Sequence, residues 1–367
     1  MKKLVFSLYF LFLIFLDWFS YLFIDPNINY LKRFYTGFYL TNRGEVTIIY
    51  GLLVIVFFTF YFYFLKLVKN KKISLKEIIF LIGTTSFVLL FSYPAMLSYD
   101  IFNYVATAKL TFLYHENPYL IMPIEFRGDP ILAFTQAANK TALYGPFWIF
   151  LTGVPYLLGF GNFIATMFSF KVFSIVFYIL TCLFIYKLTK NSLSLVLMAL
   201  NPLIVIESLV SSHNDIVMMF FALFSFYFLL KDKKAKTYLF LLLSFLIKFA
   251  TIFLLPVFIF FKRIKEKQKL SFLFLAMFVI FLISGFREIY PWYAIWFLSF
   301  AFINPKNRII LWISLAFSFS LLFRYVPFMY WGTHFGNTPL IKTSVTFFLP
   351  FVTLIYLFFF GKSKSVK

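Results

Sequence analysis

The chain has 367 residues, of which 62% are hydrophobic and only 13% charged, and it contains 60 Phe. Apolar runs long enough to cross a bilayer recur along it, which a soluble core of this size does not require. The composition therefore predicts an all-α polytopic membrane protein, built as one integral membrane domain over residues 1–367. The net charge of +21 comes from short basic clusters at the ends of apolar runs, which argues against a nucleic-acid partner.

The first apolar run, at 4–24, follows two lysines like a signal peptide, but no small-residue cleavage site follows it. We expect an uncleaved span there. The length of the apolar runs, and the charged residues that separate them, predict further spans at 46–66, 77–97, 164–186, 192–211, 215–230, 270–286, 291–303, 309–328 and 343–360. With shorter segments included, about 10–13 transmembrane or re-entrant helices are expected.

Basic residues indicate the orientation. Most of the 34 Lys and Arg stand in clusters at 2–3, 66–76, 187–190, 231–236, 262–269, 306–308 and 362–367. If all of these are cytoplasmic, the segments with Asp100, Asp215, Arg287 and His334 lie outside. We therefore expect a multi-pass protein, in the plasma membrane, with an extracytoplasmic active site.

Two segments do not fit simple crossings. The stretch 237–261 lies between two basic clusters, and about 25 residues cannot cross a core of about 30 Å twice at 1.5 Å per residue. It is predicted to be a re-entrant hairpin, with Lys248 near its tip. The stretch 144–160 contains two Pro and three Gly and is predicted to be a shallow hairpin or surface helix.

The longest stretch outside the spans, 98–143, is predicted to be an extracytoplasmic catalytic loop with short helices. Asp100 stands at its start, at the end of a span, and on a helix beginning there Asn103 and Tyr104 share its face. A general base belongs where it is fixed and partly desolvated. The alternative is that Asp100 only caps the following helix, and both roles are compatible.

A second polar segment lies between two apolar runs and consists of Ser212-His213-Asn214-Asp215. The alternative is a solvated turn whose Asp caps the next helix. Two ligand-type residues without a third are a poor metal signature, and the lone Cys182 permits neither a disulfide nor a Cys-ligated metal. We therefore expect no cofactor; a divalent metal is compatible with the sequence but not supported by it.

Lys248 lies in an apolar run, where it either snorkels to the surface or meets an anion. The aromatic run Tyr290, Trp292 and Tyr293, with Trp296, is typical of a membrane-interface belt, and a platform for a ring or isoprenoid is the alternative.

Short motifs carry a family resemblance, and they occur in order over about residues 90 to 300. The motifs are Tyr99-Asp100-Ile101-Phe102-Asn103-Tyr104, Glu116-Asn117-Pro118-Tyr119, Tyr144-Gly145-Pro146, Leu200-Asn201-Pro202-Leu203 running to His213-Asn214-Asp215, Leu246-Ile247-Lys248-Phe249, and Tyr290-Pro291-Trp292-Tyr293. The first three resemble the first external loop of the membrane glycosyltransferases of the C superfamily. Within that superfamily the pattern is most similar to polyprenol-phosphate-mannose-dependent mannosyltransferases.

The resemblance implies transfer of a hexose, expected to be mannose, from a polyprenyl-phosphate donor to a lipid-linked or cell-surface glycan acceptor. Transfer would occur with inversion on the extracytoplasmic face, with Asp100 as general base. Lys248, Arg287 and Arg324 would meet the departing phosphate. The partners are then a sugar donor, a glycan or glycolipid acceptor and membrane lipids. Substrate binding is predicted for Asn103, Tyr104, Asn117, Tyr119, Tyr144, His213, Asn214, Asp215, Lys248, Arg287, Tyr290, Trp292 and Tyr293.

Two other classes stay as alternatives. A flippase for lipid-linked sugars should show a twofold internal repeat and charges in the middle of spans in both halves, and neither is seen. An oligosaccharide polymerase or ligase should place one large external loop late in the chain, whereas the large loop here is early.

Overall fold

The computed structural model describes residues 2–28 and 37–360. Within these ranges the regular elements are all helices, and no strand occurs. Six of the helices are long and apolar enough to cross a membrane, namely Lys2–Phe23, Arg43–Lys69, Phe163–Thr189, Glu266–Ser284, Arg308–Trp331 and Thr338–Phe360. A seventh span results if Ser192–Ala199 and Pro202–Val210, bent by 54°, are counted as one. The protein is an all-α polytopic membrane protein, as the composition predicted.

Two predicted spans form shorter helices than their apolar runs suggested. The helix α5 (Leu75–Leu89) has 15 residues and α15 (Ala294–Ala301) has eight, whereas α11 (Asp215–Leu230) has the predicted bounds, with 16 residues. The run at 77–97 continues through a non-helical stretch before Pro94, where the residue preceding a proline avoids the helical region. Apolar run length therefore overestimated helix length at these places.

The described residues divide into two compact units, each made of three separate stretches of chain. Unit 1 comprises Met1–Thr41, Lys76–Phe184 and Ile206–Ile252, and unit 2 comprises Asn42–Leu75, Ile185–Val205 and Phe253–Lys367. The single membrane domain expected over 1–367 stays a prediction.

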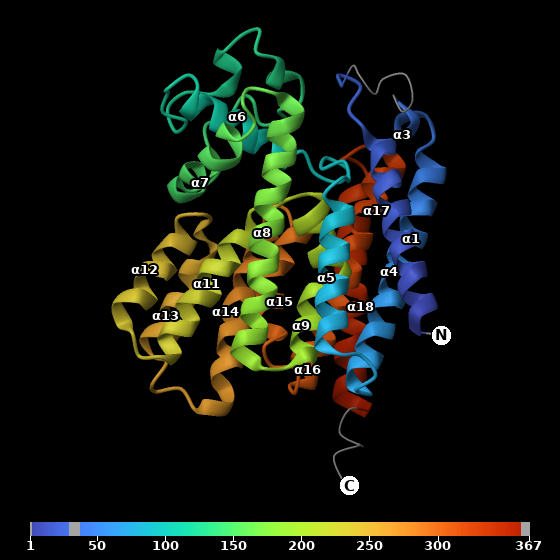
Figure 1. The fold of residues 1–367 in the computed structure, drawn as a ribbon, viewed down its shortest axis with the longest axis vertical. Helices are drawn as coiled ribbons and strands as arrows, with labels where there is room; N and C mark the ends of the chain where they lie inside the picture. Colours follow the sequence, from blue (N-terminus) through green and yellow to red (C-terminus); the bar gives the residue numbers. More distant parts are fainter. Residues whose placement is uncertain (1, 29–36, 361–367) are drawn as a thin grey trace. The chain divides into compact units, whose positions relative to one another are not determined.

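The helices of unit 1 are α1 (Lys2–Ser20), η1 (Tyr21–Phe23), α3 (Phe38–Thr41), most of α5, α6 (Asp100–Phe112), η3 (Pro123–Glu125), η4 (Pro130–Ala133), α7 (Pro146–Leu157), most of α8 (Phe163–Thr189), the π-helix η5 (Ile206–Val210), α11, α12 (Lys234–Phe245) and most of η6 (Phe249–Phe253) (Figure 1). The helices of unit 2 are α4 (Arg43–Lys69), α9 (Ser192–Ala199), α10 (Pro202–Val205), α13 (Leu254–Ile259), η7 (Glu266–Gln268), α14 (Lys269–Ser284), η8 (Pro291–Tyr293), α15, α16 (Arg308–Phe323), α17 (Tyr325–Trp331) and α18 (Thr338–Phe360).

In unit 1, α1 and α5 run in parallel. Lys2 Nζ lies 2.6 Å from Glu77 Oε1 at one end of the pair, and the Tyr21 hydroxyl donates to the Phe91 carbonyl at 2.6 Å at the other. The chain leaves α5 at this second end and reaches α6 at Asp100. The start of α6 therefore lies away from the basic N-terminal cluster, as the charge pattern requires.

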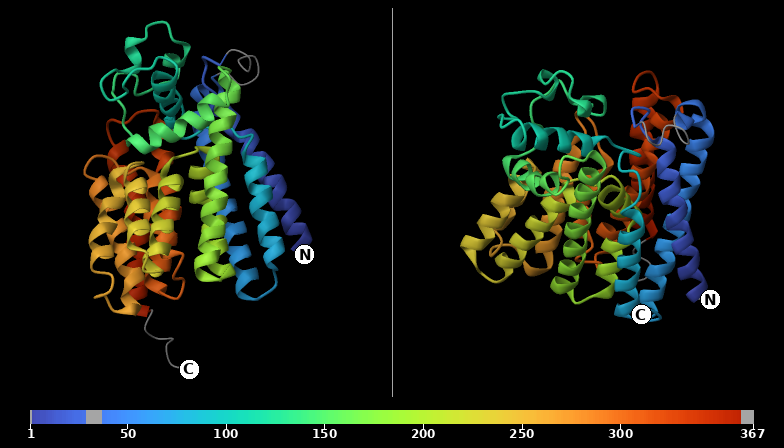
Figure 2. Two further views of the ribbon diagram at one scale, coloured as in Figure 1. Left: turned by 60° about the vertical axis from the view of Figure 1, so that its left-hand side comes forward. Right: turned by 45° about the horizontal axis from the view of Figure 1, so that its top comes forward.

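The loop joining α6 to α7 packs at one end of unit 1 (Figure 2). Asp129 anchors it, because its carboxylate accepts from Lys109 Nζ at 2.7 Å and from the Tyr114 hydroxyl at 2.6 Å. The helix α7 has 12 residues, about 18 Å at 1.5 Å per residue, which is too short to cross a bilayer.

The segment 237–261 is interrupted. The helix α12 ends at Phe245, the backbone breaks at 246–248, and η6 and α13 follow. In unit 1, α12 packs against α11, where Ser244 Oγ donates to the Met218 carbonyl at 2.8 Å. The break falls at Lys248, where the hairpin tip was expected, but re-entry into the membrane stays a prediction.

In unit 2, α4 runs antiparallel to α16 and α17. The Tyr50 hydroxyl donates to the Leu322 carbonyl at 3.0 Å. At the other end a cavity of about 290 Å³ is lined by Lys66, Lys69, Leu193 and Trp312, among others. The basic clusters near 66, 190 and 308 therefore share one end of unit 2, which supports the topology inferred from charge. The cluster at 362–367 lies outside the described residues.

Candidate active site

An ionic cluster in unit 1 joins Asp100 to the polar segment 212–215. Asp100 Oδ2 lies 3.5 Å from His213 Nδ1, and Glu207 Oε2 lies 3.3 Å from His213 Nε2. Lys248 Nζ lies 3.0 Å from both carboxylate oxygens of Asp215. The side chains of Asp100 and Lys248 are 24% and 19% exposed, whereas the other three are 0% exposed. Asp100 and Lys248 are thus the members that a ligand can reach.

Asp100 occupies the first turn of α6, and Tyr99 holds the N-cap position without a side-chain cap hydrogen bond. The interpretation of Asp100 as only an N-cap residue is therefore wrong. A carboxylate in the first turn is favoured by the positive end of the helix dipole. Asn103 Nδ2 donates to Asp100 Oδ1 at 3.4 Å, so the expected i, i+3 neighbour does restrain this carboxylate.

Irregular backbone presents His213 to its two carboxylates. The π-helix η5 includes Glu207, and the His213 amide donates to the Glu207 carbonyl at 2.9 Å. Ser212 has a φ of +56°, in the left-handed region that a residue with a Cβ rarely adopts. Such strain costs on the order of 1–3 kcal/mol and persists where the surroundings impose it, often at functional sites.

The cluster sets the charges of Asp100 and His213. Burial raises the pKa of Asp100, but the hydrogen bond and charge of His213, with the charge of Lys248, outweigh it and hold that pKa below its usual range. Burial lowers the pKa of His213, but the carboxylates of Asp100 and Glu207 outweigh it and raise this pKa to about 9. At neutral pH Asp100 is therefore a carboxylate and His213 an imidazolium.

Asn214 and Tyr104 connect the polar segment 212–215 to α6. The Tyr104 hydroxyl accepts from the Asn214 amide N–H at 3.3 Å, and the rings of Tyr144 and Trp148 lie 4.8 and 5.0 Å from the Tyr104 ring. The Asn214 side chain is buried, yet its oxygen and nitrogen make no hydrogen bond within the described part of the chain. A buried amide in this state is costly unless a ligand or water joins it.

Two of the sequence motifs meet at Gly145. The amides of Gly145 and Phe147 donate to the carbonyls of Ile247 and Leu246, each at 3.0 Å. A Cβ built on Gly145 would lie 2.1 Å from the Leu246 oxygen, so only glycine fits. The carbonyls at the end of α12 thereby satisfy amides at the start of α7, and this contact adjoins Lys248.

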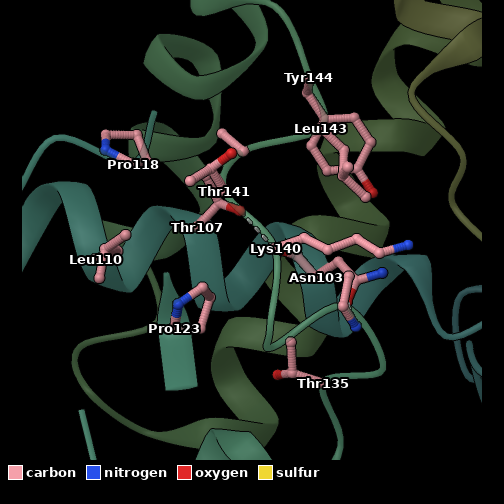
Figure 3. Close-up of a pocket in the computed structure, with 12 residues that line it drawn as sticks. Asn103, Thr107, Leu110, Pro118, Pro123, Thr135, Lys140, Thr141, Leu143 and Tyr144 are labelled. Carbon is pink, nitrogen blue, oxygen red and sulfur yellow. Dashed lines mark hydrogen bonds between the residues drawn. The ribbon is translucent and has the colours of Figure 1, made fainter. Parts of the chain in front are cut away.

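Asn103 and Tyr144 also line a narrow cavity with Thr107 and Lys140 (Figure 3). Its volume is about 10 Å³, room for about one water molecule. Asn103 Oδ1 accepts from the Ala137 amide at 3.3 Å. This cavity is too small for a sugar, so Asn103 is here a residue that ties the loop to α6.

Asn117 and Tyr119 belong to a larger, separate cavity. It has a volume of about 450 Å³ and is lined by Thr111, His115, Glu116, Asn117, Pro118, Tyr119, Pro146 and Ile149. The Tyr119 hydroxyl donates to the Tyr144 carbonyl at 2.8 Å. Thr111 follows Asp100 by three turns of α6, about 16 Å at 1.5 Å per residue, so the Thr111 side of this cavity is far from Asp100. Its Pro146 side follows Gly145, which contacts Leu246 and Ile247 next to Lys248.

The remaining predicted residues, Arg287, Tyr290, Trp292 and Tyr293, lie in unit 2. Tyr290 stacks on Trp292 with ring centroids 4.6 Å apart, and Tyr293 stacks on Trp296 at 4.3 Å. The aromatic run is therefore a stacked group within its own unit.

Two functional candidates escaped the sequence reasoning. Glu207 lies within an apolar run, and this position is itself a signal, because ionisable groups there need a partner. Glu288 proved to be bound by Arg324 and Lys342, 36 and 54 residues further along, a separation that no local pattern reveals.

The cluster does not resemble a metal site. His213 stands between Asp100 and Glu207 rather than converging with them on one point. Across residues 2–28 and 37–360, no group of three or more His, Cys, Asp or Glu is placed to hold a metal ion. Metal independence stays a prediction.

Comparison with known proteins gave one result. Neither the curated proteins nor the solved structures include a match to this chain. The sequence profile of a family described as "Alpha-(1->6)-mannopyranosyltransferase, N-terminal domain" matches residues 27–262. This range covers more than half of the chain and includes every member of the ionic cluster. The chain therefore belongs to this family of mannosyltransferases of the C superfamily, and it is a membrane glycosyltransferase.

Proposed function

We propose that the protein transfers mannose from a polyprenyl-phosphate donor to a hydroxyl of a lipid-linked or cell-surface glycan on the extracytoplasmic face. Mannose follows from the family. The observation that carries the proposal is Asp100, a part-exposed carboxylate at the end of a buried ionic cluster. The end of unit 1 that bears Asp100 lies away from the Lys2–Glu77 pair, which supports the extracytoplasmic assignment.

Asp100 would act as general base in a single inverting displacement. As the acceptor oxygen attacks the anomeric carbon, its proton passes to the carboxylate of Asp100. The bond from the anomeric carbon to the phosphate oxygen breaks, and polyprenyl phosphate leaves with the electron pair. Inversion at a β-linked donor gives an α-linked product, the linkage named in the family description. Asp100 then returns its proton to water.

The neighbours of Asp100 have supporting roles. His213 keeps the carboxylate ionised and fixes its position, at the expense of lower basicity. The buried amide of Asn214 can hydrogen-bond a sugar hydroxyl without a large loss of side-chain entropy. Cations must meet the departing phosphate, and Lys248 and Arg287 remain our candidates. Lys248 already pairs with Asp215, so its contact with phosphate needs a direct test.

The cavity at Tyr119 suits a second part of the acceptor. Its lining combines an aromatic ring with the polar side chains of His115, Glu116 and Asn117, a mixture that fits the apolar faces and hydroxyls of a carbohydrate. Because its Thr111 side lies about 16 Å from Asp100 along α6, an acceptor of several sugars can extend from Asp100 to that side.

Reconstitution of the purified protein in liposomes tests the proposal. We expect mannose to move to a mannan oligosaccharide from polyprenyl-phosphate mannose but not from a nucleotide-activated mannose. Nuclear magnetic resonance of the product should show an α linkage. Transfer from the nucleotide sugar would contradict the donor assignment. Movement of the lipid-linked sugar across the bilayer without a new glycosidic bond would favour a flippase instead.

A further inference from the structure

Unit 2 contains a second ionic cluster, formed by Glu288, Arg324 and Lys342, which we call the Arg324 cluster. Arg324 Nη2 lies 3.3 Å from Glu288 Oε1, and Lys342 Nζ donates to the same oxygen. Arg324 also donates through Nε to the Ile289 carbonyl at 2.7 Å and through Nη1 to Thr346 Oγ1 at 2.9 Å. The cluster therefore fixes two cations on one carboxylate.

The Arg324 cluster carries an excess positive charge in a buried place. The side chains of Arg324 and Lys342 are 8% and 11% exposed, whereas that of Glu288 is 35% exposed. His334 does not add to the charge, because burial and the charge of Lys342 hold its pKa below the usual range. Buried excess charge is costly unless an anion joins it. Glu288 is the most exposed of the three side chains, so an anion that displaces its carboxylate can pair with both cations.

Exposed apolar residues lie close to the members of the Arg324 cluster in sequence. Phe286 and Tyr290 flank Glu288 in sequence, Leu340 precedes Lys342 by two residues, and all three are exposed. Exposed aromatic and aliphatic side chains beside a buried cation pair match an amphiphile, with an anionic head and an apolar chain.

The cluster lies at the extracytoplasmic end of unit 2 under the charge-based topology. Arg324 follows Arg308 by 16 residues on α16 and its C-cap, about 24 Å at 1.5 Å per residue. The end near Arg308 is the one that Lys66 and Lys69 share. Arg324 is therefore at the opposite end, away from the basic clusters.

We propose that Arg324 and Lys342 bind the phosphate of a polyprenyl-phosphate lipid, that this phosphate displaces Glu288 from the two cations, and that Phe286, Tyr290 and Leu340 contact the isoprenoid chain. A guanidinium fork beside an ammonium group suits a phosphate monoester or diester. The choice of an isoprenoid lipid rests on the proposed function. The assignment of a phosphate group rests on the two cations and not on that function.

Two variants separate a phosphate site from a structural ion cluster, because they change its charge in opposite directions. Binding of sugar-free polyprenyl phosphate to the full-length protein is measured by native mass spectrometry, independently of transfer. Lys342→Met should weaken binding about tenfold or more, equivalent to one strong charge-assisted contact. Glu288→Gln removes the competing anion and should leave binding unchanged or tighter. Lys342→Arg keeps the charge and should bind nearly as the parent does.

The outcomes decide the proposal. Unchanged affinity in Lys342→Met overturns it, and so does weaker affinity in Glu288→Gln when the variant unfolds at the parental temperature. If Glu288→Gln does not fold, the contrast between Lys342→Met and Lys342→Arg decides. Competition by inorganic phosphate supports a headgroup site, and equal binding of phosphatidylglycerol overturns the isoprenoid assignment. Because no sugar is transferred in this assay, its result stands apart from the fate of the transferase proposal.

Discussion

His213 Nδ1 lies 3.5 Å from Asp100 Oδ2, while its Nε2 lies 3.3 Å from Glu207 Oε2, so one imidazole joins a part-exposed carboxylate to a fully buried one. The buried Glu207 helps to keep His213 charged, and charged His213 keeps Asp100 ionised. His213 is therefore a positioning residue, and its protonation should be visible in the stability of the protein.

Stability should fall as the pH rises from 6.5 through about 9. The folded pKa of His213 is raised from 6.5 to about 9, so its contribution is fully present below pH 6.5 and is lost as the pH passes through about 9. Thermal unfolding across this range should show a decreasing melting temperature. In His213→Gln this slope should largely disappear, and an identical slope in the variant would remove His213 as its origin.

Lys248→Met should destabilise the protein by about 3–5 kcal/mol, because it leaves the buried carboxylate of Asp215 without its cation. The double variant Lys248→Met with Asp215→Asn should recover most of this loss, as measured by thermal unfolding. Donor titration on the double variant then tests the phosphate role. Unchanged donor affinity there would exclude Lys248 from binding the phosphate.

Gly145→Ala should lower the free energy of unfolding by about 1–3 kcal/mol, because its Cβ would collide with the Leu246 carbonyl. It should also reduce transfer, since the contact adjoins Lys248. Gly83→Ala is the matched control in the helix α5, where an added Cβ meets nothing within 4 Å. This control should be neutral or slightly stabilising. Equal unfolding temperatures for the two variants would contradict the close approach.

Tyr119→Ala should raise the KM for long acceptors and leave the KM for a disaccharide unchanged, because only a long acceptor extends from Asp100 to the Thr111 side of the cavity that Tyr119 lines. Tyr119→Phe keeps the ring that packs against a sugar and should behave nearly as the parent does. Kinetics with acceptors of increasing length provide the measurement. An equal increase in KM for every acceptor would show that the cavity does not select length.

The sequence predicted the helical membrane class, because composition is a local signal. It also singled out Asp100 as a candidate, because an ionisable group at a span boundary is another local signal. It did not predict the contacts among Asp100, Glu207 and His213, since more than 100 residues separate Asp100 from the other two. Lys248 shows the same limit. Its need for an anion was evident from its apolar run, but Asp215 as that anion became clear only from the fold. The predicted helix lengths were too great where an apolar run continued past the end of a helix into a non-helical stretch, as it does before Pro94.

Asp100→Asn tests the central claim most directly. The substitution preserves side-chain size and removes the proton acceptor, so transfer under saturating donor and acceptor should fall by about 100-fold or more. The protein should still insert and purify. Glu125→Gln, on an exposed residue of the same loop that caps the Met122 amide, is the matched control and should retain parental transfer. A loss of about 100-fold or more in Asp100→Asn with parental activity in Glu125→Gln is the predicted result, and near-parental transfer by Asp100→Asn would contradict Asp100 as the general base.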